Sequence, residues 1–246
     1  MTDKLAETKL FFENSSWYLG KRSYYVQIRS QIVQELLKDS KFESILDIGC
    51  GDGSISLPLL APGTQLTLMD LSQNMLDLAR SRVPSQFQTQ VKVLNGDFLN
   101  VDLPSNAYDL VICLGVLSYV DLLESFFEKI RQLLKPGGIL FIECTDGNHP
   151  ISRFVRTICS VKEGLLGSKD NLELHVHSAA VIAAKFREMG FENLATYRYS
   201  TPLPISRRLF SQKFHHKKIC AIYGNASNNR MAWLGNECLF QFKKSK

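Results

Sequence analysis

Three glycines and two aspartates close an apolar run at residues 46–53, which read LDIGCGDG. Gly49, Gly51 and Gly53 would permit a tight turn after a strand and let a ligand approach the backbone. The helix expected next would offer unsatisfied N–H groups at its start. The pattern predicts a nucleotide site of the Rossmann type. Because the dinucleotide fingerprint is G-x-G-x-x-G and this turn reads G-x-G-x-G, the glycines alone leave the nucleotide open.

Two further acids follow at the ends of the next two predicted strands. Asp70 ends the run TQLTLMD, 17 residues after Gly53. A carboxylate there can accept hydrogen bonds from both ribose hydroxyls, or it can simply favour the dipole of the next helix. Asp97, in NGDFL, could accept a hydrogen bond from the amine of an adenine, and Phe98 could stack on the ring. A plain turn is the alternative for these two residues.

Hydrophobic periodicity predicts the elements that must position these residues. Helices are expected at 23–39, 72–83 with Ser72 as N-cap, 119–134 and 178–189. Strands are expected at 44–48, 64–70, 90–95, 108–114, 139–144, 191–200 and 237–244. Strands that alternate with helices indicate a doubly wound, mostly parallel α/β sheet.

The same pattern predicts one domain, 1–246, with a helical cap at 1–40 and a nucleotide-binding half at 41–145. Residues 146–177 and 201–235 do not fit the alternation, and we expect them to be substrate-side insertions. In open α/β sheets the ligand lies at the carboxyl edge, which these segments could cover.

Composition excludes several classes of protein. No apolar run reaches about 18 residues, so no transmembrane span is predicted. The charged N-terminal segment lacks the basic-then-apolar order of a signal peptide, so we expect a cytoplasmic protein. The six cysteines form no Cys-x-x-Cys pair, which argues against a zinc site or a redox motif.

The net charge of +5 is uneven along the chain. Residues 198–246 hold ten Lys and Arg against one acid. This asymmetry predicts an anionic or carrier-bound partner, or weak contact with a membrane surface, although a solvated surface without a partner is an equal alternative. No RNA-binding module accompanies it, so we expect no nucleic-acid partner.

The order of these motifs resembles that of the class I S-adenosylmethionine (SAM)-dependent methyltransferases. The resemblance rests on LDIGCGDG, LMDLSQNML, NGDF, YDLVICLGVLSYV and LLKPGGILFIE. It implies a Rossmann-like, doubly wound sheet of seven strands, the last of which (237–244) is antiparallel. It also implies SAM as the cofactor.

The resemblance further implies roles for particular residues. Gly49 and Gly51 would pass close to the methionine part of SAM, Asp47 would help to hold its amino group, and the backbone of Leu114 would line the same end. In the similar ubiquinone-biosynthesis O-methyltransferases an Arg at the spacing of Arg29 reaches the SAM carboxylate, although a surface Arg on an amphipathic helix is the alternative. The predicted cofactor-binding residues are Arg29, Asp47, Gly49, Cys50, Gly51, Asp70, Leu71, Asp97, Phe98 and Leu114.

The residues after the fourth strand, LGVLSY, lack the motifs of amino- and base-carbon methyltransferases, and no acidic cluster suggests magnesium. This favours metal-independent, in-line methyl transfer to a small-molecule acceptor. O-methylation is favoured because apolar sites with few bases suit acidic hydroxyls. The alternatives are an N- or C-methyltransferase of a natural product or lipid, a SAM-binding protein without catalysis, and an NAD-dependent oxidoreductase.

The candidate catalytic residues are His149, which could also contact the substrate, and Tyr119. His175 and His177 are alternative candidates for the catalytic base. The other interpretation is that they serve only in local packing or helix capping. Near the N-terminus, Tyr18 and Tyr24 could line an apolar substrate pocket or belong to the core of a helical cap.

Overall fold

A mixed sheet of seven strands, in the order β3-β2-β1-β4-β5-β9-β6, forms the centre of the protein. The computed structural model describes residues 3–13, 15–157, 175–200 and 210–246, with some side chains in the first two helices excepted. The strands are β1 (Ser44–Ile48), β2 (Gln65–Asp70), β3 (Val91–Asn95), β4 (Tyr108–Cys113), β5 (Leu134–Thr145), β6 (Phe191–Tyr199) and β9 (Glu237–Lys244). Strands β1 to β5 pair in parallel, whereas β9 is antiparallel to both neighbours. The predicted fold class is therefore confirmed.

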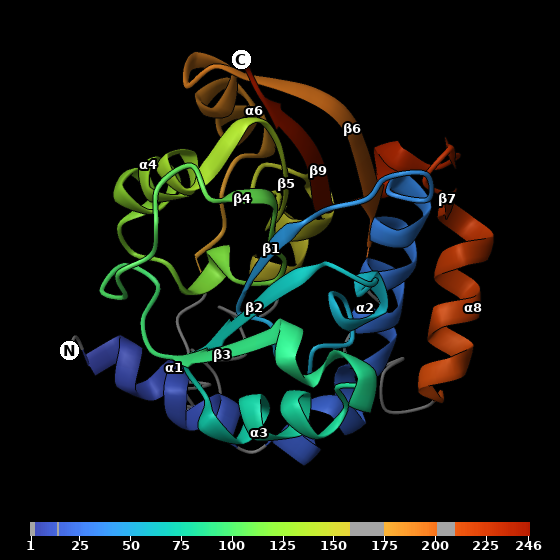
Figure 1. Cartoon of the computed structure of the whole chain (residues 1–246). Helices are drawn as coiled ribbons and strands as arrows, with labels where there is room; N and C mark the ends of the chain where they lie inside the picture. The colour runs from blue at the N-terminus through green and yellow to red at the C-terminus, as the bar shows by residue number, and fades with distance from the viewer. Residues whose placement is uncertain (1–2, 14, 158–174, 201–209) are drawn as a thin grey trace.

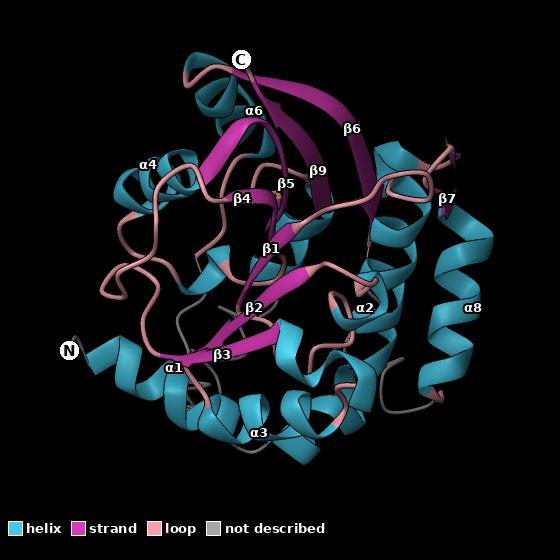
Figure 2. Ribbon diagram, in the orientation of Figure 1, coloured by secondary structure: helices cyan, strands magenta, loops and turns pink. Residues whose placement is uncertain are grey.

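Helices cover both faces of this sheet (Figure 1). They are α1 (Asp3–Glu13), α2 (Ser15–Leu36), α3 (Gln73–Ser81), α4 (Leu123–Leu133), α6 (Ala179–Glu188) and α8 (Gln212–Tyr223). Short 3₁₀ turns η1 (Leu57–Leu59), η2 (Ser85–Gln90), η3 (Leu117–Tyr119) and η4 (Ala232–Leu234) lie in the connections, together with a small hairpin of β7 (Gly224–Asn225) and β8 (Asn228–Asn229) (Figure 2). None of the helices in these ranges is long and apolar enough to cross a membrane.

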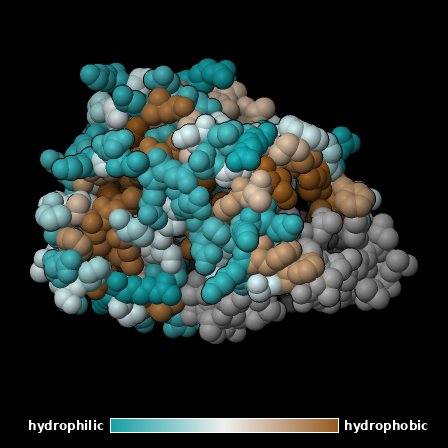
Figure 3. All heavy atoms as spheres, turned by 90° about the vertical axis from the view of Figure 1, so that its right-hand side faces the viewer, coloured by the Kyte–Doolittle hydropathy of each residue, from teal (hydrophilic) through white to brown (hydrophobic). Residues whose placement is uncertain are grey.

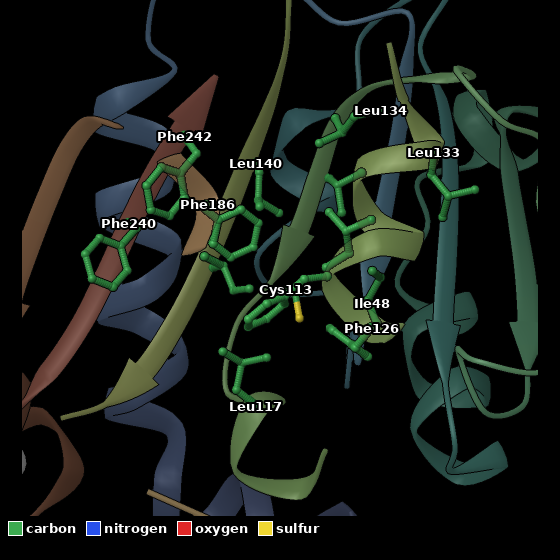
Figure 4. Close-up of a cluster of buried hydrophobic side chains, with 14 of the residues drawn as sticks. Ile48, Cys113, Leu117, Phe126, Leu133, Leu134, Leu140, Phe186, Phe240 and Phe242 are labelled. Atoms are coloured by element: carbon green, nitrogen blue, oxygen red, sulfur yellow. The ribbon is translucent and has the colours of Figure 1, made fainter. Parts of the chain in front are cut away.

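One hydrophobic core lies between the sheet and the helices α4 and α6. Side chains point alternately to the two faces of a strand, so Val111 and Cys113 of β4 enter this core while Leu110 and Ile112 enter the other. Phe186 of α6 is fully buried and stacks on Phe242 of β9, with ring centroids 4.9 Å apart. Figure 4 shows how these rings and the aliphatic side chains of β5 fill the layer.

The second core lies on the opposite face, against α2, α3 and α8. It contains a buried ionic group, in which Arg29 of α2 pairs with Glu143 of β5 at 2.5 Å. The hydroxyl of Tyr199 on β6 donates a hydrogen bond of 2.6 Å to the same carboxylate. Desolvation of two charges costs several kcal/mol and offsets much of their attraction, so the pair links α2 to β5 with little expected net gain in stability.

The largest differences from the sequence expectation are at the starts of three elements. Helix α2 begins at Ser15 rather than near 23, and α4 begins at Leu123 rather than 119 because residues 117–119 form η3. Strand β5 begins at Leu134, so it includes the KPGG segment that was expected to precede it. The pairing of β4 with β5 shifts register between Tyr108 and Leu110, which accommodates this irregular start.

Candidate functional site

The glycine turn after β1 is fixed against the end of β2. The backbone N–H groups of Gly49 and Cys50 both donate to the carbonyl of Met69, at 2.8 and 3.0 Å. Gly49 has a φ of +68°, and a Cβ on it would lie 2.4 Å from Cγ2 of Val116. Gly51 also has a positive φ, +54°, but a Cβ there would meet open space. Backbone conformation therefore requires glycine at both positions, and close packing requires it at Gly49 as well.

The carboxylate of Asp70 is oriented by two backbone donors. Its Oδ2 accepts from the N–H of Gly51 at 2.9 Å, and its Oδ1 accepts from the N–H of Ser72 at 2.9 Å. Ser72 in turn caps α3, because its hydroxyl accepts from the N–H of Met75. Burial raises the pKa of Asp70 and the two backbone hydrogen bonds oppose that rise. Each oxygen keeps a further lone pair that can accept a ligand hydroxyl.

Asp70 lies in the wall of a cavity of about 560 Å³ at the carboxyl edge of the parallel strands. Seven of the predicted cofactor-binding residues line it, namely Gly49, Gly51, Asp70, Leu71, Asp97, Phe98 and Leu114. They come from the ends of β1, β2, β3 and β4. The order of the strands therefore brings together residues that are distant in the sequence, as expected for a ligand site at this edge.

Asp97 and Phe98 border the cavity and also have structural roles. Asp97 caps its own turn by accepting hydrogen bonds from the N–H of Leu99 and the amide of Asn100. Phe98 is buried, lies edge-on to Phe126 and has the ammonium of Lys129 above its ring, 5.1 Å from the centroid. The turn that was the alternative for these residues is present, and it places both of them in the cavity wall.

Asp47 lies beneath the glycine turn and does not line the cavity. Its carboxylate is buried and accepts a hydrogen bond of 2.5 Å from the hydroxyl of Ser56. Desolvation raises its pKa to about 7, and the neighbouring carboxylates of Asp70 and Asp52 add to the rise. A cationic group bound nearby would favour the charged form and lower this pKa.

Arg29 reaches the turn that follows β4. A Cβ on Gly115 would lie 2.7 Å from the Nη1 atom of Arg29, and Gly115 lines the cavity. The guanidinium is held from behind by Glu143 and lies 5.3 Å from the ring centroid of Tyr25. It therefore lies next to the cavity wall without forming part of it.

An acid that lines the cavity, Asp121, contacts one of two histidines that lie beside η3 and outside the cavity lining. Tyr119 and Asp121 line the cavity, and Nε2 of His175 lies 2.8 Å from Oδ1 of Asp121. The backbone N–H of His175 donates to the carbonyl of Ser118, and Nε2 of His177 lies 3.0 Å from the carbonyl of Leu117. Both histidines are thus fixed to the loop that carries Tyr119 and Asp121.

Besides Arg29 and Asp47, the predicted residues His149, Tyr24 and Cys50 do not line the cavity, and neither do the alternative bases His175 and His177. The ring nitrogens of His149 are engaged locally, by the carbonyl of Trp233 and the N–H of Ile151. Tyr24 is fully buried and stacks on Tyr25, and the thiol of Cys50 packs into the second core. The side chain of Tyr18 lies outside the described residues.

Several cavity residues were not anticipated from the sequence. Thr8 and Phe12 come from α1, and the ring of Phe12 lies edge-on to that of Tyr119 with centroids 5.4 Å apart. Met75, Val116 and Leu122 add apolar surface. The sequence of α1 has no periodic pattern that would mark a side facing a ligand. Thr8 and Phe12 could therefore be assigned to the cavity only once the packing of α1 was known. The hydroxyl of Ser72 and the amide of Asn74 both donate to carbonyls at the end of α1, which holds that helix over the cavity.

A second hollow, of about 690 Å³, lies along the polar side of α2 and includes Asp52, Ser54 and Arg82. None of the predicted site residues lines it, and Asp52 is already paired with Arg82. Among the described residues, no group of three or more His, Cys, Asp or Glu is placed to hold a metal ion. The cavity at the sheet edge is therefore the better candidate site.

Comparison with known sequences supports this assignment. Residues 46–142 match a family described as "Methyltransferase domain". The chain is 38% identical over 104 residues to a ubiquinone biosynthesis O-methyltransferase of Rickettsia canadensis, covering 42% of each chain. It is 31% identical over 118 residues to a demethylmenaquinone methyltransferase of Symbiobacterium thermophilum, covering 46% of each. These matches span less than half the length of either relative.

Comparison with solved structures extends the likeness to the whole fold. The magnesium protoporphyrin IX methyltransferase of Synechocystis, solved with bound S-adenosylhomocysteine, aligns with a TM-score of 0.68 at 17% identity, over 99% of this chain and 100% of that one. At that identity the alignment shows the fold alone. The family match covers residues 46–142, which include the glycine turn and the ends of the strands that line the cavity, and the structural alignment extends the same fold over the rest of the chain.

Proposed function

We propose that this chain is a SAM-dependent methyltransferase acting on a small-molecule acceptor. The observation that carries the proposal is the carboxylate of Asp70, which the N–H of Gly51 fixes in the wall of the cavity. A nucleoside needs such an acceptor for its two ribose hydroxyls. Residues 46–142 match a methyltransferase family, the relatives are named as methyltransferases, and the solved neighbour holds S-adenosylhomocysteine, all of which favours SAM over NAD as the nucleoside ligand.

The cavity residues fit SAM in a definite order. Asp70 would accept from the ribose hydroxyls, while Leu71, Asp97 and Phe98 would surround the adenine. SAM would supply a methyl group bound to a positively charged sulfur, so the methyl carbon is electrophilic and the leaving group is a neutral thioether. Gly49 and the backbone of Leu114 would lie beside the methionine part.

Two charged residues behind the cavity wall would complete the methionine end. We propose that Arg29 pairs with the carboxylate of SAM and that Asp47 stabilises its positive charge. Glu143 pairs with the Arg29 guanidinium and accepts a hydrogen bond from Tyr199, and this support favours the proposed role of Arg29.

The acceptor would enter beside Tyr119 and Asp121. We propose metal-independent O-methylation, in which His175, oriented by Asp121, takes the proton of the acceptor hydroxyl. Tyr119 would close the same end of the cavity. His149 is the weaker candidate because its ring nitrogens are engaged with the backbone of neighbouring loops.

The acceptor is proposed to be a small, largely apolar molecule with an acidic hydroxyl. The apolar lining of the cavity supports this, and so do the printed names of the quinone-pathway relatives. The contribution of α1 to the wall supports the role of residues 1–40 as a cap. That residues 146–177 and 201–235 cover the acceptor side stays a prediction, as does the attraction of an anionic acceptor by the basic stretch 198–246.

Replacing Asp70 by Ala should weaken SAM binding by about 1–3 kcal/mol, because the ribose hydroxyls would lose a buried acceptor. Asp77→Ala is the matched control, since Asp77 is exposed on the neighbouring helix α3 and bonds only to Gln73 among the described contacts. Calorimetric titration of SAM into both variants measures the effect. Equal affinities for the two variants would show that Asp70 does not hold the ribose.

SAM binding should depend on pH through Asp47. The pKa of Asp47 is about 7 in the ligand-free protein, and bound SAM would favour the charged carboxylate. Below pH 7, Asp47 must therefore release a proton when SAM binds. Affinity should therefore fall by up to about tenfold for each pH unit below 7, and level off above it. Asp47→Asn should remove this slope. A wild-type affinity that is constant between pH 5 and 7, as measured by titration calorimetry, would show that Asp47 is not linked to the ligand.

The pair formed by His175 and Asp121 should act on turnover and not on cofactor affinity. His175→Gln and Asp121→Asn should each lower kcat by about 10² to 10⁴, the usual contribution of a general base, with SAM affinity unchanged. His149→Gln serves as the control because the ring of His149 contacts the backbone of Trp233 and Ile151, whereas His175 pairs with Asp121 in the cavity wall. If His149→Gln loses turnover and His175→Gln retains it, the assignment of the base is reversed.

A further inference from the structure

One face of α8 is exposed and combines aromatic and basic side chains. Phe210, just before the helix, and Phe214 and Ile222 within it are 47%, 38% and 42% exposed. Lys213, Lys217 and Lys218 lie between them and are also exposed. Figure 3 views the molecule from the side on which α8 lies and shows hydrophobic patches set among hydrophilic atoms. This face lies outside the cavity and has no role in the function proposed above.

The opposite face of α8 fixes the helix to the protein. Ile219 and Tyr223 are buried in the core shared with α2, and the ring of buried His215 lies 5.6 Å from that of Tyr24. The hydroxyl of Ser211 caps the first turn by accepting from the N–H of Phe214. The exposed face therefore belongs to a helix that is already folded. Binding of a partner would not carry the entropic cost of ordering this helix.

The charge of α8 has a single sign. The helix Gln212–Tyr223 contains three lysines and no acid, within a stretch, 198–246, that holds ten Lys and Arg against one acid. A surface of this charge complements an anionic one. Lysine stems can lie along apolar surface while their ammonium groups stay in water, so lysines beside Phe and Ile suit a boundary between apolar and polar media.

The aromatic side chains favour a lipid surface over RNA. Phe210 and Phe214 stack on each other with centroids 4.5 Å apart, and Nζ of Lys218 lies 5.6 Å from the centroid of Phe214. The ring faces that a base would stack on are thus partly covered. A second copy of the chain is disfavoured because a two-fold contact through this face would bring its lysines together.

We propose that the exposed face of α8 docks on the surface of an anionic lipid bilayer. Phe210, Phe214 and Ile222 would enter the boundary between headgroups and acyl chains, while the three lysines contact the phosphates of the lipids. In Figure 1, α8 begins toward the end of the molecule where α1 and α3 lie, and these two helices contribute Thr8, Phe12 and Met75 to the cavity wall. Docking would therefore bring the cavity side of the protein close to apolar molecules dissolved in the bilayer.

Co-flotation of the full chain with vesicles tests the proposal. The chain should float with vesicles of phosphatidylcholine and phosphatidylglycerol at low salt, and not with phosphatidylcholine alone. Changing Lys213, Lys217 and Lys218 together to Gln should lower the partition constant by about 100-fold, at about fivefold for each lysine near an anionic surface. Phe210→Ser with Phe214→Ser should lower it by about tenfold or more, because the apolar contact is lost.

Matched control variants distinguish the effect of the exposed face of α8 from the effect of changing exposed residues elsewhere. Lys38, Lys41 and Lys92 are exposed elsewhere, and their triple change to Gln should leave flotation almost unchanged, as should Val181→Ser on α6. SAM affinity, measured on the same samples, should be that of the wild type, so the test does not depend on the proposed activity. Equal flotation with the two kinds of vesicle, or equal losses in the α8 and control triples, would overturn the proposal. Binding of a single-stranded RNA without binding of vesicles would overturn it as well.

Discussion

The hydrogen bond from the N–H of Gly51 to the carboxylate of Asp70 joins the ends of two neighbouring parallel strands. It can form because β1 and β2 pair in register, with Ile48 opposite Met69, so the turn after one strand meets the last residue of the other. The carbonyl of Met69 holds the same turn from below. The position of the cavity, the exposed backbone of the glycines and the direction of the Asp70 carboxylate all depend on this junction.

The same junction concentrates negative charge in a poorly hydrated place. Asp47, Asp52 and Asp70 lie close enough for their charges to interact, and Arg82 pairs only with Asp52 among them in the described contacts. Burial raises the pKa of both Asp47 and Asp70, which means that the ligand-free protein bears a cost for keeping them charged. A ligand that carries a sulfonium and an ammonium group would relieve that cost, and a neutral or anionic one would not. Charge thus favours the cofactor that the family comparison also favours.

The sequence predicted the parts of the site that depend on local pattern. The glycine turn, the acid at the end of β2, the N-cap Ser72 and the strand of residues 237–244 lie where expected, because each is set by a short motif or by the pattern of apolar residues, whereas the antiparallel direction of that strand was implied by the resemblance. The prediction of the helix at 119–134 failed at its start, since residues 117–119 form a 3₁₀ turn that apolar periodicity does not distinguish from an α-helix.

Contacts between distant segments could not be read from the sequence. Thr8 and Phe12 reach the cavity only through the docking of α1 on α3. The pairing of His175 with Asp121 requires the segment before α6 to lie along η3, and the pairing of Arg29 with Glu143 joins a helix to a strand more than a hundred residues away. Such contacts are set by the packing of the whole sheet and its helices, which no local pattern encodes.

The central claim is that the cavity at the junction of β1 and β2 binds SAM. Titration calorimetry of the full chain with S-adenosylhomocysteine and, separately, with NAD tests it most directly, since both ligands carry an adenosine ribose and only the first carries the methionine part. We predict binding of S-adenosylhomocysteine in a one-to-one complex and no binding of NAD. Tight binding of NAD with no binding of S-adenosylhomocysteine would contradict the account.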